Sequence, residues 1–298
     1  MSPSYPNFAF TTDMWSDKYQ HQNFISISIH YVDENWKLRK ATLGMNKFDK
    51  QKTTVNIRAD CERILKLYFK ESEVAIIIQN SILVTDGGSN MTNIFPQRFP
   101  CQCHKLNLFV EWTLNDKPLA TEKYMNKEIP PKKLFNLKTQ CPNFQESLSS
   151  TKHLVTFFKQ SALNSKLSKT MKQEVETRWN SELALINSYL DMKNEIAALL
   201  LEIGKLEKVS SINNAILEEF SKFLQPFKDS SDILSGDKYP TINLVALHFN
   251  MLEKHIEITH NDSCEMRNLK VRQHVVLKNI AWLKIFIMLL VCSIRGNI

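Results

Sequence analysis

Apolar and polar residues alternate in the first part of the chain. Between Phe24 and Val32, one face carries Ile25, Ile27 and Ile29, while serine and histidine fill the positions between them. A period of two predicts a half-buried β-strand. We predict a strand before it at Asn7–Asp13 and another after it at Trp36–Leu43, joined by short loops as antiparallel neighbours.

The pattern then changes to a helical period. Thr53 or Thr54 can cap a helix whose apolar face includes Ile57, Cys61 and Tyr68. A further strand is predicted at Ser81–Thr85, followed by Asp86 and two glycines, and Ser89-Asn90 can cap the next helix. The order predicts an α/β mixed sheet with helices packed on it.

Strand patterns end at about residue 104, and helical ones follow. Residues 115–147 are rich in proline and are predicted to be a loop. The predicted helices are His104–Leu114, Leu154–Lys172, Ser181–Ile203, Ile212–Lys228, Thr241–Ile258 and Arg267–Ile294. We therefore expect three parts: an α/β part at 1–115, a basic linker at 116–147 and an all-α part at 148–298.

Positive charge is concentrated in the middle of the chain. The whole chain has a formal net charge of +7. Residues 117–178 contain twelve Lys or Arg and five acids, so this segment alone accounts for that excess. Such a block suits a polyanion such as DNA, because lysine and arginine displace counterions from phosphates. A solvated lysine-rich surface without a partner is the alternative.

The cysteines and the apolar runs indicate in which cellular compartment the protein is located. Six scattered cysteines do not form a secreted disulfide framework, and no signal peptide is visible, which favours cytoplasm or nucleus. The uncharged run Ile285–Ile294 is shorter than the roughly 20 residues of a membrane-spanning helix. We expect no membrane partner. This run is either a buried helix or a C-terminus produced by an incorrect gene model.

Two aspartates follow predicted strands. Asp13 and Asp86 end the runs TTD and ILVTD. Carboxylates at adjacent strand ends can share Mg²⁺ or Mn²⁺, which activate a water or hydroxyl in phosphodiester chemistry. Turn residues or helix caps are the alternative, because aspartate is common in both.

The sequence around these aspartates resembles the hAT superfamily of DNA transposases. The residues that carry the resemblance occur in the family's order: Thr11-Thr12-Asp13-Met14-Trp15-Ser16, Thr85-Asp86-Gly87-Gly88-Ser89-Asn90-Met91, Cys101-Gln102-Cys103-His104, Thr177-Arg178-Trp179-Asn180-Ser181 and Tyr239-Pro240-Thr241. They cover residues 10–260 approximately. Each motif is weak alone, and their shared order makes the resemblance specific.

The resemblance implies an RNase H-like core, incomplete here at 1–115, followed by an all-helical insertion domain. In such enzymes two aspartates and a glutamate bind Mg²⁺ or Mn²⁺ and cut transposon ends, which leaves hairpins on the flanking DNA. Asp13 and Asp86 would be the two aspartates. The implied location is the nucleus. The implied partners are DNA, as transposon ends or hairpins bound with low sequence specificity, and possible full-length transposases.

The resemblance also assigns DNA contacts. Trp179 would stack on an extruded base, Arg178 would contact a phosphate, and Cys101 with His104 would support the site near that base. Base stacking on tryptophan contributes about 1–3 kcal/mol. Alternatively, Trp179 starts a helix and packs in the core. Zinc at Cys101 and His104 is disfavoured, because a structural site needs four ligands and no second pair has suitable spacing.

The chain departs from the family pattern in three places. It begins directly before the first acidic motif, without a BED zinc finger, and it has no C-terminal dimerisation run and no match to the third acid. Glu174, Glu176 and Glu265 do not fit that acid's pattern. We therefore expect a truncated, inactive transposase remnant that binds metal weakly. A domesticated nuclear DNA-binding or regulatory protein and a helical protein-interaction scaffold are the alternatives.

Overall fold

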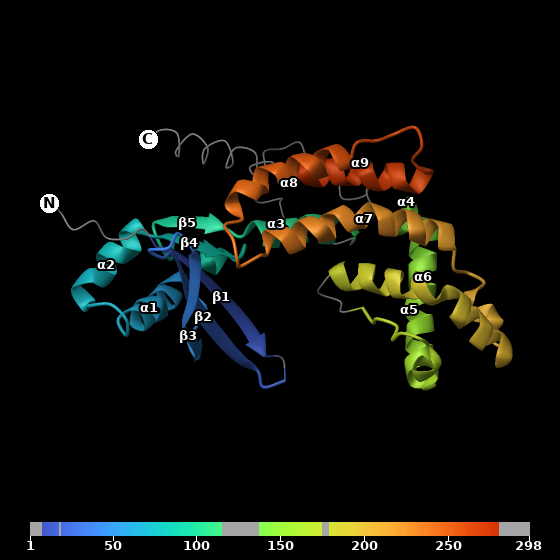
Figure 1. The fold of residues 1–298 in the computed structure, drawn as a ribbon, viewed down its shortest axis with the longest axis horizontal. Coiled ribbons are helices and arrows are strands. Elements are labelled where there is room, and N and C mark those ends of the chain that lie inside the picture. The colour runs from blue at the N-terminus through green and yellow to red at the C-terminus, as the bar shows by residue number, and fades with distance from the viewer. Residues whose placement is uncertain (1–7, 18, 115–136, 175–178, 280–298) are drawn as a thin grey trace. The chain divides into compact units, whose positions relative to one another are not determined.

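The computed structural model describes residues 8–17, 19–114, 137–174 and 179–279. The chain divides into two compact units (Figure 1). The first comprises residues 1–105 and Leu234–Asn243, and the second comprises the remainder. The boundary lies inside one helix, between Lys105 and Leu106, and the return of Leu234–Asn243 to the first unit has no signal in the sequence.

The first unit is built on a five-stranded mixed sheet of order β3-β2-β1-β4-β5. The strands β1, β4 and β5 are parallel to one another, and β2 runs antiparallel to both β1 and β3. The strand bounds are Ala9–Asp17 for β1, Gln22–Val32 for β2, Leu38–Lys47 for β3, Ile82–Thr85 for β4 and Gln97–Pro100 for β5. The α/β mixed sheet and the helical region that follows confirm the predicted fold class.

One face of this sheet holds the core of the unit. Ile25, Ile27 and Ile29 are buried there, as their alternation predicts. Paired residues of neighbouring strands share a face, so Phe10, opposite Ile29 and Leu83, joins them. Two helices, α1 at Thr54–Leu65 and α2 at Glu71–Asn80, supply the apolar side chains that complete this core. The other face carries polar residues such as Asp13 and Ser26 together with the stacked pair Trp15 and Phe24.

Local hydrogen bonds explain the start of α1. Thr53 is its N-cap, and the Thr53 hydroxyl accepts a hydrogen bond from the backbone N–H of Asn56 at 3.3 Å. This confirms one of the two predicted caps. By contrast, Ser89-Asn90 begins only a single 3-10 turn, Ser89–Met91, in place of the predicted helix.

The third strand begins later than its predicted start at Trp36. Asp33 accepts hydrogen bonds from the backbone N–H groups of Asn35 and Lys37, which holds a turn through Trp36. Trp36 has a left-handed φ of 58° and is 90% exposed. An aromatic residue therefore does not indicate a strand when a nearby aspartate can hold the backbone in a turn.

The elements α2 and β5 are absent from the sequence-based prediction.

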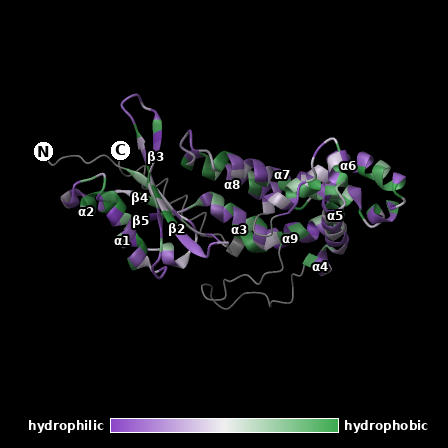
Figure 2. Cartoon of the chain, turned by 90° about the horizontal axis from the view of Figure 1, so that it is seen from below, coloured by the Kyte–Doolittle hydropathy of each residue, from purple (hydrophilic) through white to green (hydrophobic). Residues whose placement is uncertain are grey.

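The second unit is helical. Its elements are most of α3 (Gln102–Leu114), then α4 (Leu137–Gln140), α5 (Pro142–Gln160), α6 (Trp179–Glu202), α7 (Asn214–Leu234), most of α8 (Ile242–His255), and α9 (Cys264–Asn279). Apolar and polar residues alternate around these helices (Figure 2). Stacking of Phe144 on Phe220, with centroids 3.6 Å apart, joins α5 to α7 in the core.

The predicted helix Leu154–Lys172 is wrong at both ends. α5 begins at Pro142, because proline is well tolerated at the first helical position, and this helix includes part of the predicted loop. It ends at Gln160, and Ala162 then adopts a left-handed conformation with φ of 58°. Residues 280–298, which contain the apolar run, lie outside the described residues. No helix among those described is long and apolar enough to cross a membrane.

Candidate functional site

The two aspartates lie level with each other on neighbouring parallel strands. Thr11 of β1 pairs with Val84 of β4. Asp13 is two residues after Thr11, and Asp86 is two residues after Val84. The register of β1 with β4 therefore places both aspartates at the same level along the strand direction. The carboxyl ends of parallel strands are where open α/β sheets bind ligands. The register, continued by two residues, therefore places the two predicted acids level with each other at this edge.

Asp13 does not end its strand, contrary to the prediction. β1 continues to Asp17 as a hairpin with β2, whereas its other neighbour, β4, stops at Thr85. The residue is thus inside a strand and also level with the sheet edge. Its position opposite Ser26 places it on the face away from the buried Phe10.

Each aspartate uses one carboxylate oxygen for a local backbone hydrogen bond. Oδ1 of exposed Asp13 accepts from the N–H of Met14 at 2.9 Å. Oδ1 of half-buried Asp86 accepts from the N–H of Gly88 at 3.0 Å, which is the turn role that aspartate often has. Neither Oδ2 has a hydrogen-bonding partner among the described residues, so both oxygens remain able to ligate a cation.

The donor set at this edge is suitable for Mg²⁺ but incomplete. Oxygen ligands from two carboxylates suit this ion, which also keeps several waters. Within residues 8–17, 19–114, 137–174 and 179–279, no group of three or more His, Cys, Asp or Glu side chains could hold a metal ion. The pair thus supplies two ligating groups, and the remaining positions would be filled by water, DNA or other residues.

Cys101 and His104 lie beside the strand end that carries Asp86. The N–H of Cys101 donates to the carbonyl of Thr85 at 2.7 Å. A Cβ atom at Gly87 would be 3.4 Å from Cδ2 and Nε2 of His104, an ordinary van der Waals distance, so the imidazole lies against this turn. The Cys-x-x-His segment therefore packs against the loop after β4, beside Asp86.

The start of α3 stabilises negative charge on the Cys101 sulfur. A hydrogen bond from the Cys103 thiol, and others from the backbone N–H groups of His104 and Cys103, lower the pKa of Cys101 to about 6 against the effect of burial. The same thiol–thiol hydrogen bond raises the pKa of Cys103. A cysteine at a helix N-terminus commonly has a lowered pKa, as this one does.

Two cationic residues at this edge were missed by sequence reasoning. Arg98 of β5 donates from Nε to Oγ1 of Thr85 at 2.8 Å and from Nη2 to the carbonyl oxygen of Asp86. Lys105 of α3 is buried, and burial together with the charge of Arg98 lowers its pKa to about 7. No local pattern singles out either residue, because only the pairing of β5 with β4 brings Arg98 to Asp86.

Trp179 belongs to the second unit and is packed in its core. It is the first residue of α6, and only 4% of it is exposed. Its indole Nε1 is buried without a hydrogen-bonding partner among the residues that the structure describes. This is the packing that the alternative interpretation predicts. Arg178 lies outside the described residues.

The acids near the Arg-Trp motif and in α9 have partners of their own. Glu174 and Glu182 form ion pairs with Lys152, at 2.7 and 3.5 Å. The carboxylate of Glu265 accepts hydrogen bonds from the N–H groups of Asn143 and Phe144 at the start of α5. These contacts account for Glu174 and Glu265 within the second unit, while Glu176 lies outside the described residues.

The basic segment is only partly covered by the structure. Residues 115–136 and 175–178, which include many of its lysines, lie outside the described part. Of the described lysines, Lys152 is paired with buried or half-buried glutamates, and Lys169 pairs with Asp191 at 3.5 Å. Because its ammonium group is already paired with two glutamates, Lys152 is not a candidate for a simple contact with a DNA phosphate.

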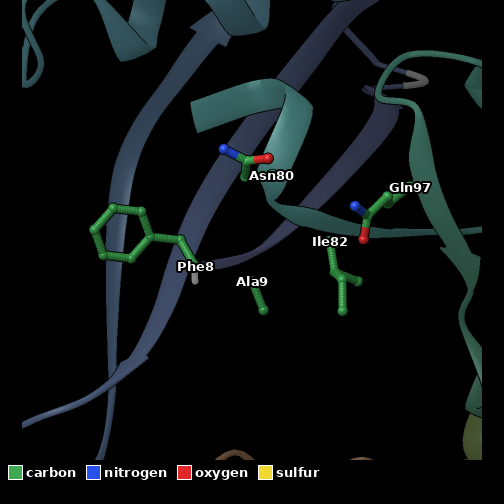
Figure 3. A pocket seen from close by; sticks show the side chains of 5 residues that line it. All are labelled: Phe8, Ala9, Asn80, Ile82 and Gln97. Atoms are coloured by element: carbon green, nitrogen blue, oxygen red, sulfur yellow. The ribbon is translucent and has the colours of Figure 1, made fainter. Parts of the chain in front are cut away.

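A hollow of about 360 Å³ opens at the opposite edge of the sheet (Figure 3). Its lining includes Ala9, Ile82 and Gln97, which are register partners at the starts of β1, β4 and β5. Phe8 and Asn80 complete it. Because the aspartates lie toward the other ends of these strands, this hollow is separate from the candidate metal site.

Comparison with known proteins connects this geometry to transposases. Residues 11–98 match the family model described as ZBED1 RNase-like domain, and this range includes both aspartates. The chain is 26% identical over 275 residues to the “Transposable element Hobo transposase” of Drosophila melanogaster, covering 91% of this chain and 37% of that protein. It is 26% identical over 262 residues to the “Putative AC transposase” of Zea mays, covering 80% of this chain and 29% of that protein. The chain spans about a third of the length of these curated relatives.

Proposed function

We propose that this chain, which is similar over most of its length to two proteins named as transposases, serves metal-dependent DNA transposition of the hAT type. Asp13 and Asp86 hold Mg²⁺ or Mn²⁺ at the sheet edge, and the substrate is DNA at a transposon end or hairpin. The register that aligns the two acids is the observation that carries the proposal. The site of action is the nucleus.

The chemistry of the pair follows from charge and geometry. Metal ions bound by carboxylates activate a water or a 3′-hydroxyl and stabilise the leaving oxygen of a phosphodiester. The residues of this chain contribute the two negative ligands and the backbone that holds them. Arg98 brings positive charge to the same edge, where a DNA phosphate would be attracted.

We expect these 298 residues by themselves to bind metal and DNA without strand transfer. A third carboxylate does not join Asp13 and Asp86 among the described residues. Phosphoryl transfer requires closely fixed reacting groups, and two carboxylates alone hold metals loosely. The complete reaction would need a further acid, from other residues or from an associated full-length transposase.

Metal binding by the purified chain tests the proposal. Mn²⁺ should broaden the NMR amide signals of Gly87 and Gly88, and Asp13→Asn or Asp86→Asn should each weaken this effect. Asp237→Asn is the matched control, because Asp237 belongs to the same unit and pairs with Lys40. Equal Mn²⁺ affinity in wild type and both aspartate variants would refute the metal site.

DNA binding and cleavage form the second half of the test. A hairpin duplex should bind with an affinity that falls steeply as salt rises, because phosphate contacts release counterions. Cleavage of a terminal-repeat duplex by the chain alone, abolished by Asp86→Asn, would overturn the expected inactivity while supporting the site. Absence of any DNA binding would contradict the proposal.

A DNA-binding or regulatory protein without catalysis is the second candidate. It is favoured by the aspartate pair having no third acidic partner in the described part of the chain. This candidate predicts hairpin binding that is insensitive to Asp13→Asn and Asp86→Asn. A helical scaffold, in which the second unit contacts other proteins, predicts no salt-dependent DNA binding at all.

A further inference from the structure

Arg98 is bound to the end of the strand that presents Asp86. Its Nε donates to Oγ1 of Thr85 at 2.8 Å, and its Nη2 donates to the carbonyl oxygen of Asp86. β4 has ended at Thr85, and the chain of β5 turns into α3 after Pro100. The carbonyl of Asp86 therefore lies beyond the β4–β5 ladder, and the guanidinium of Arg98 supplies a hydrogen bond to it.

Other contacts fix the same short segment. The hydroxyl of Thr85 donates to the carbonyl oxygen of Asp86 at 3.1 Å, and the carbonyl of Thr85 accepts from the N–H of Cys101 at 2.7 Å. On the far side, Oδ1 of Asp86 accepts from Gly88. The guanidinium of Arg98 is thus the side chain from a neighbouring strand that joins this segment to β5.

The shape of the arginine side chain suits this contact. A guanidinium is planar and carries adjacent N–H donors in a rigid fork, so it can reach two acceptors on consecutive residues. A lysine ammonium has the same charge, but its donors are on a single nitrogen at the end of a flexible side chain. Arg98 is half-buried, which reduces the competition from water for both acceptors.

We propose that Arg98 is a positioning residue, which holds the backbone of Asp86 so that its carboxylate meets a divalent cation together with Asp13. This inference rests on the proposed function, in which those two acids bind metal. Groups that orient a ligating carboxylate typically change metal affinity by about 10–100-fold when they are removed. Arg98 acts through Asp86 and does not itself contact the metal.

The charge of Arg98 has the opposite effect from its geometry. A cation close to the site repels Mn²⁺, so loss of charge alone would strengthen metal binding. Arg98→Lys keeps the charge and removes the fork, whereas Arg98→Gln removes the charge and keeps a single donor group. Comparison of these two variants separates the positioning effect from the electrostatic one.

The experiment uses the full chain and Mn²⁺ as the probe. Broadening of the Gly87 and Gly88 amide signals gives the Mn²⁺ affinity of each variant, and thermal unfolding is recorded on the same samples. We expect Arg98→Lys to weaken Mn²⁺ binding by about tenfold. Arg39→Lys is the control. Arg39 lies on the edge strand β3, and its guanidinium pairs at 2.6 Å with Asp33 in the turn before that strand.

The outcomes distinguish this inference from the function on which it rests. Wild-type affinity in Arg98→Lys, with Asp86→Asn still impaired, overturns the positioning role alone. Unchanged binding in Asp86→Asn overturns the metal site itself. If Arg98→Lys does not fold, Arg98→Ala is measured with ethylguanidinium and with ethylammonium. Recovery of Mn²⁺ binding with ethylguanidinium, but not with ethylammonium, supports the inference. Equal recovery with the two compounds, or no recovery with either, contradicts it.

Discussion

The carboxylate of Glu265 should stabilise the second unit by capping a helix more than a hundred residues earlier in the chain. Pro142 is the first residue of α5 and has no N–H, and the N-cap residue Cys141 makes no side-chain capping bond. The next two N–H groups, of Asn143 and Phe144, donate to Glu265 at 2.9 and 3.0 Å. The side-chain amide of Asn143 donates to it as well, at 2.8 Å.

The cost of removing this carboxylate follows from the burial of its donors. The Phe144 N–H lies beside a buried side chain, and loss of a charged partner there costs about 1.5–3 kcal/mol. Asn143 is exposed and can bind water, so its two bonds add less than about 1 kcal/mol in total. The interaction with the helix dipole adds about 0.3–1 kcal/mol. We expect Glu265→Ala to destabilise the unit by about 3 kcal/mol, as the sum of these contributions.

Glu265→Gln should cost about half as much, because one oxygen still accepts a hydrogen bond while the amide group faces the remaining donors. The assay is urea unfolding monitored by circular dichroism, together with hydrogen exchange at Phe144. Glu146→Ala is the control, since Glu146 is an exposed acid on the same helix, and it should change stability by less than about 0.5 kcal/mol. A Glu265→Ala variant as stable as Glu146→Ala would refute the capping role.

Three further predictions concern other positions. Burial and the charge of Lys40 lower the pKa of His30 below 6.5 despite Asp237, so the unfolded chain binds the proton more readily. The stability of the first unit should therefore be constant well above pH 6.5 and fall below it, and His30→Gln should flatten that decline in pH-dependent unfolding; an equally steep decline would contradict the assignment. Trp179→Ala should destabilise by about 3–5 kcal/mol, whereas Trp179→Phe should cost less than about 1.5 kcal/mol in urea unfolding because it keeps most of the ring volume. A Phe variant as unstable as the Ala variant would exclude simple packing. Thr53→Ala should cost about 1 kcal/mol through the lost cap of α1, with Thr53→Ser retaining stability; equal losses in both variants would argue against the cap.

Residue patterns predicted the parts of the fold that depend on local chemistry. The alternation at Ile25, Ile27 and Ile29 gave a strand with one buried face, and Thr53 gave the start of α1. Trp36 was misassigned to a strand because the turn depends on the side chain of Asp33 accepting two backbone N–H groups. The strand β5 has the sequence QRFP, which lacks the run of β-branched and apolar residues that made the equally short β4 recognisable.

The candidate site shows the same division. The sequence alone singled out Asp13 and Asp86, and it placed Cys101 and His104 in one motif, because the residue types around them resemble those of a known family. It could not show that the two aspartates are level, since that depends on the register of β1 with β4. It also could not find Arg98, whose partners are reached only through the pairing of β5 with β4.

Local signals thus indicated which residues are candidates for chemistry, because side-chain type and short-range hydrogen bonding depend on consecutive positions. Tertiary structure decided which of these residues lie near one another. Strand register set Asp13 and Asp86 at the same height. Packing placed the indole of Trp179 in a core, and a hydrogen bond across the second unit made Glu265 a helix cap. Such pairings depend on the burial and hydrogen bonding of segments far apart in the chain, which no local pattern contains.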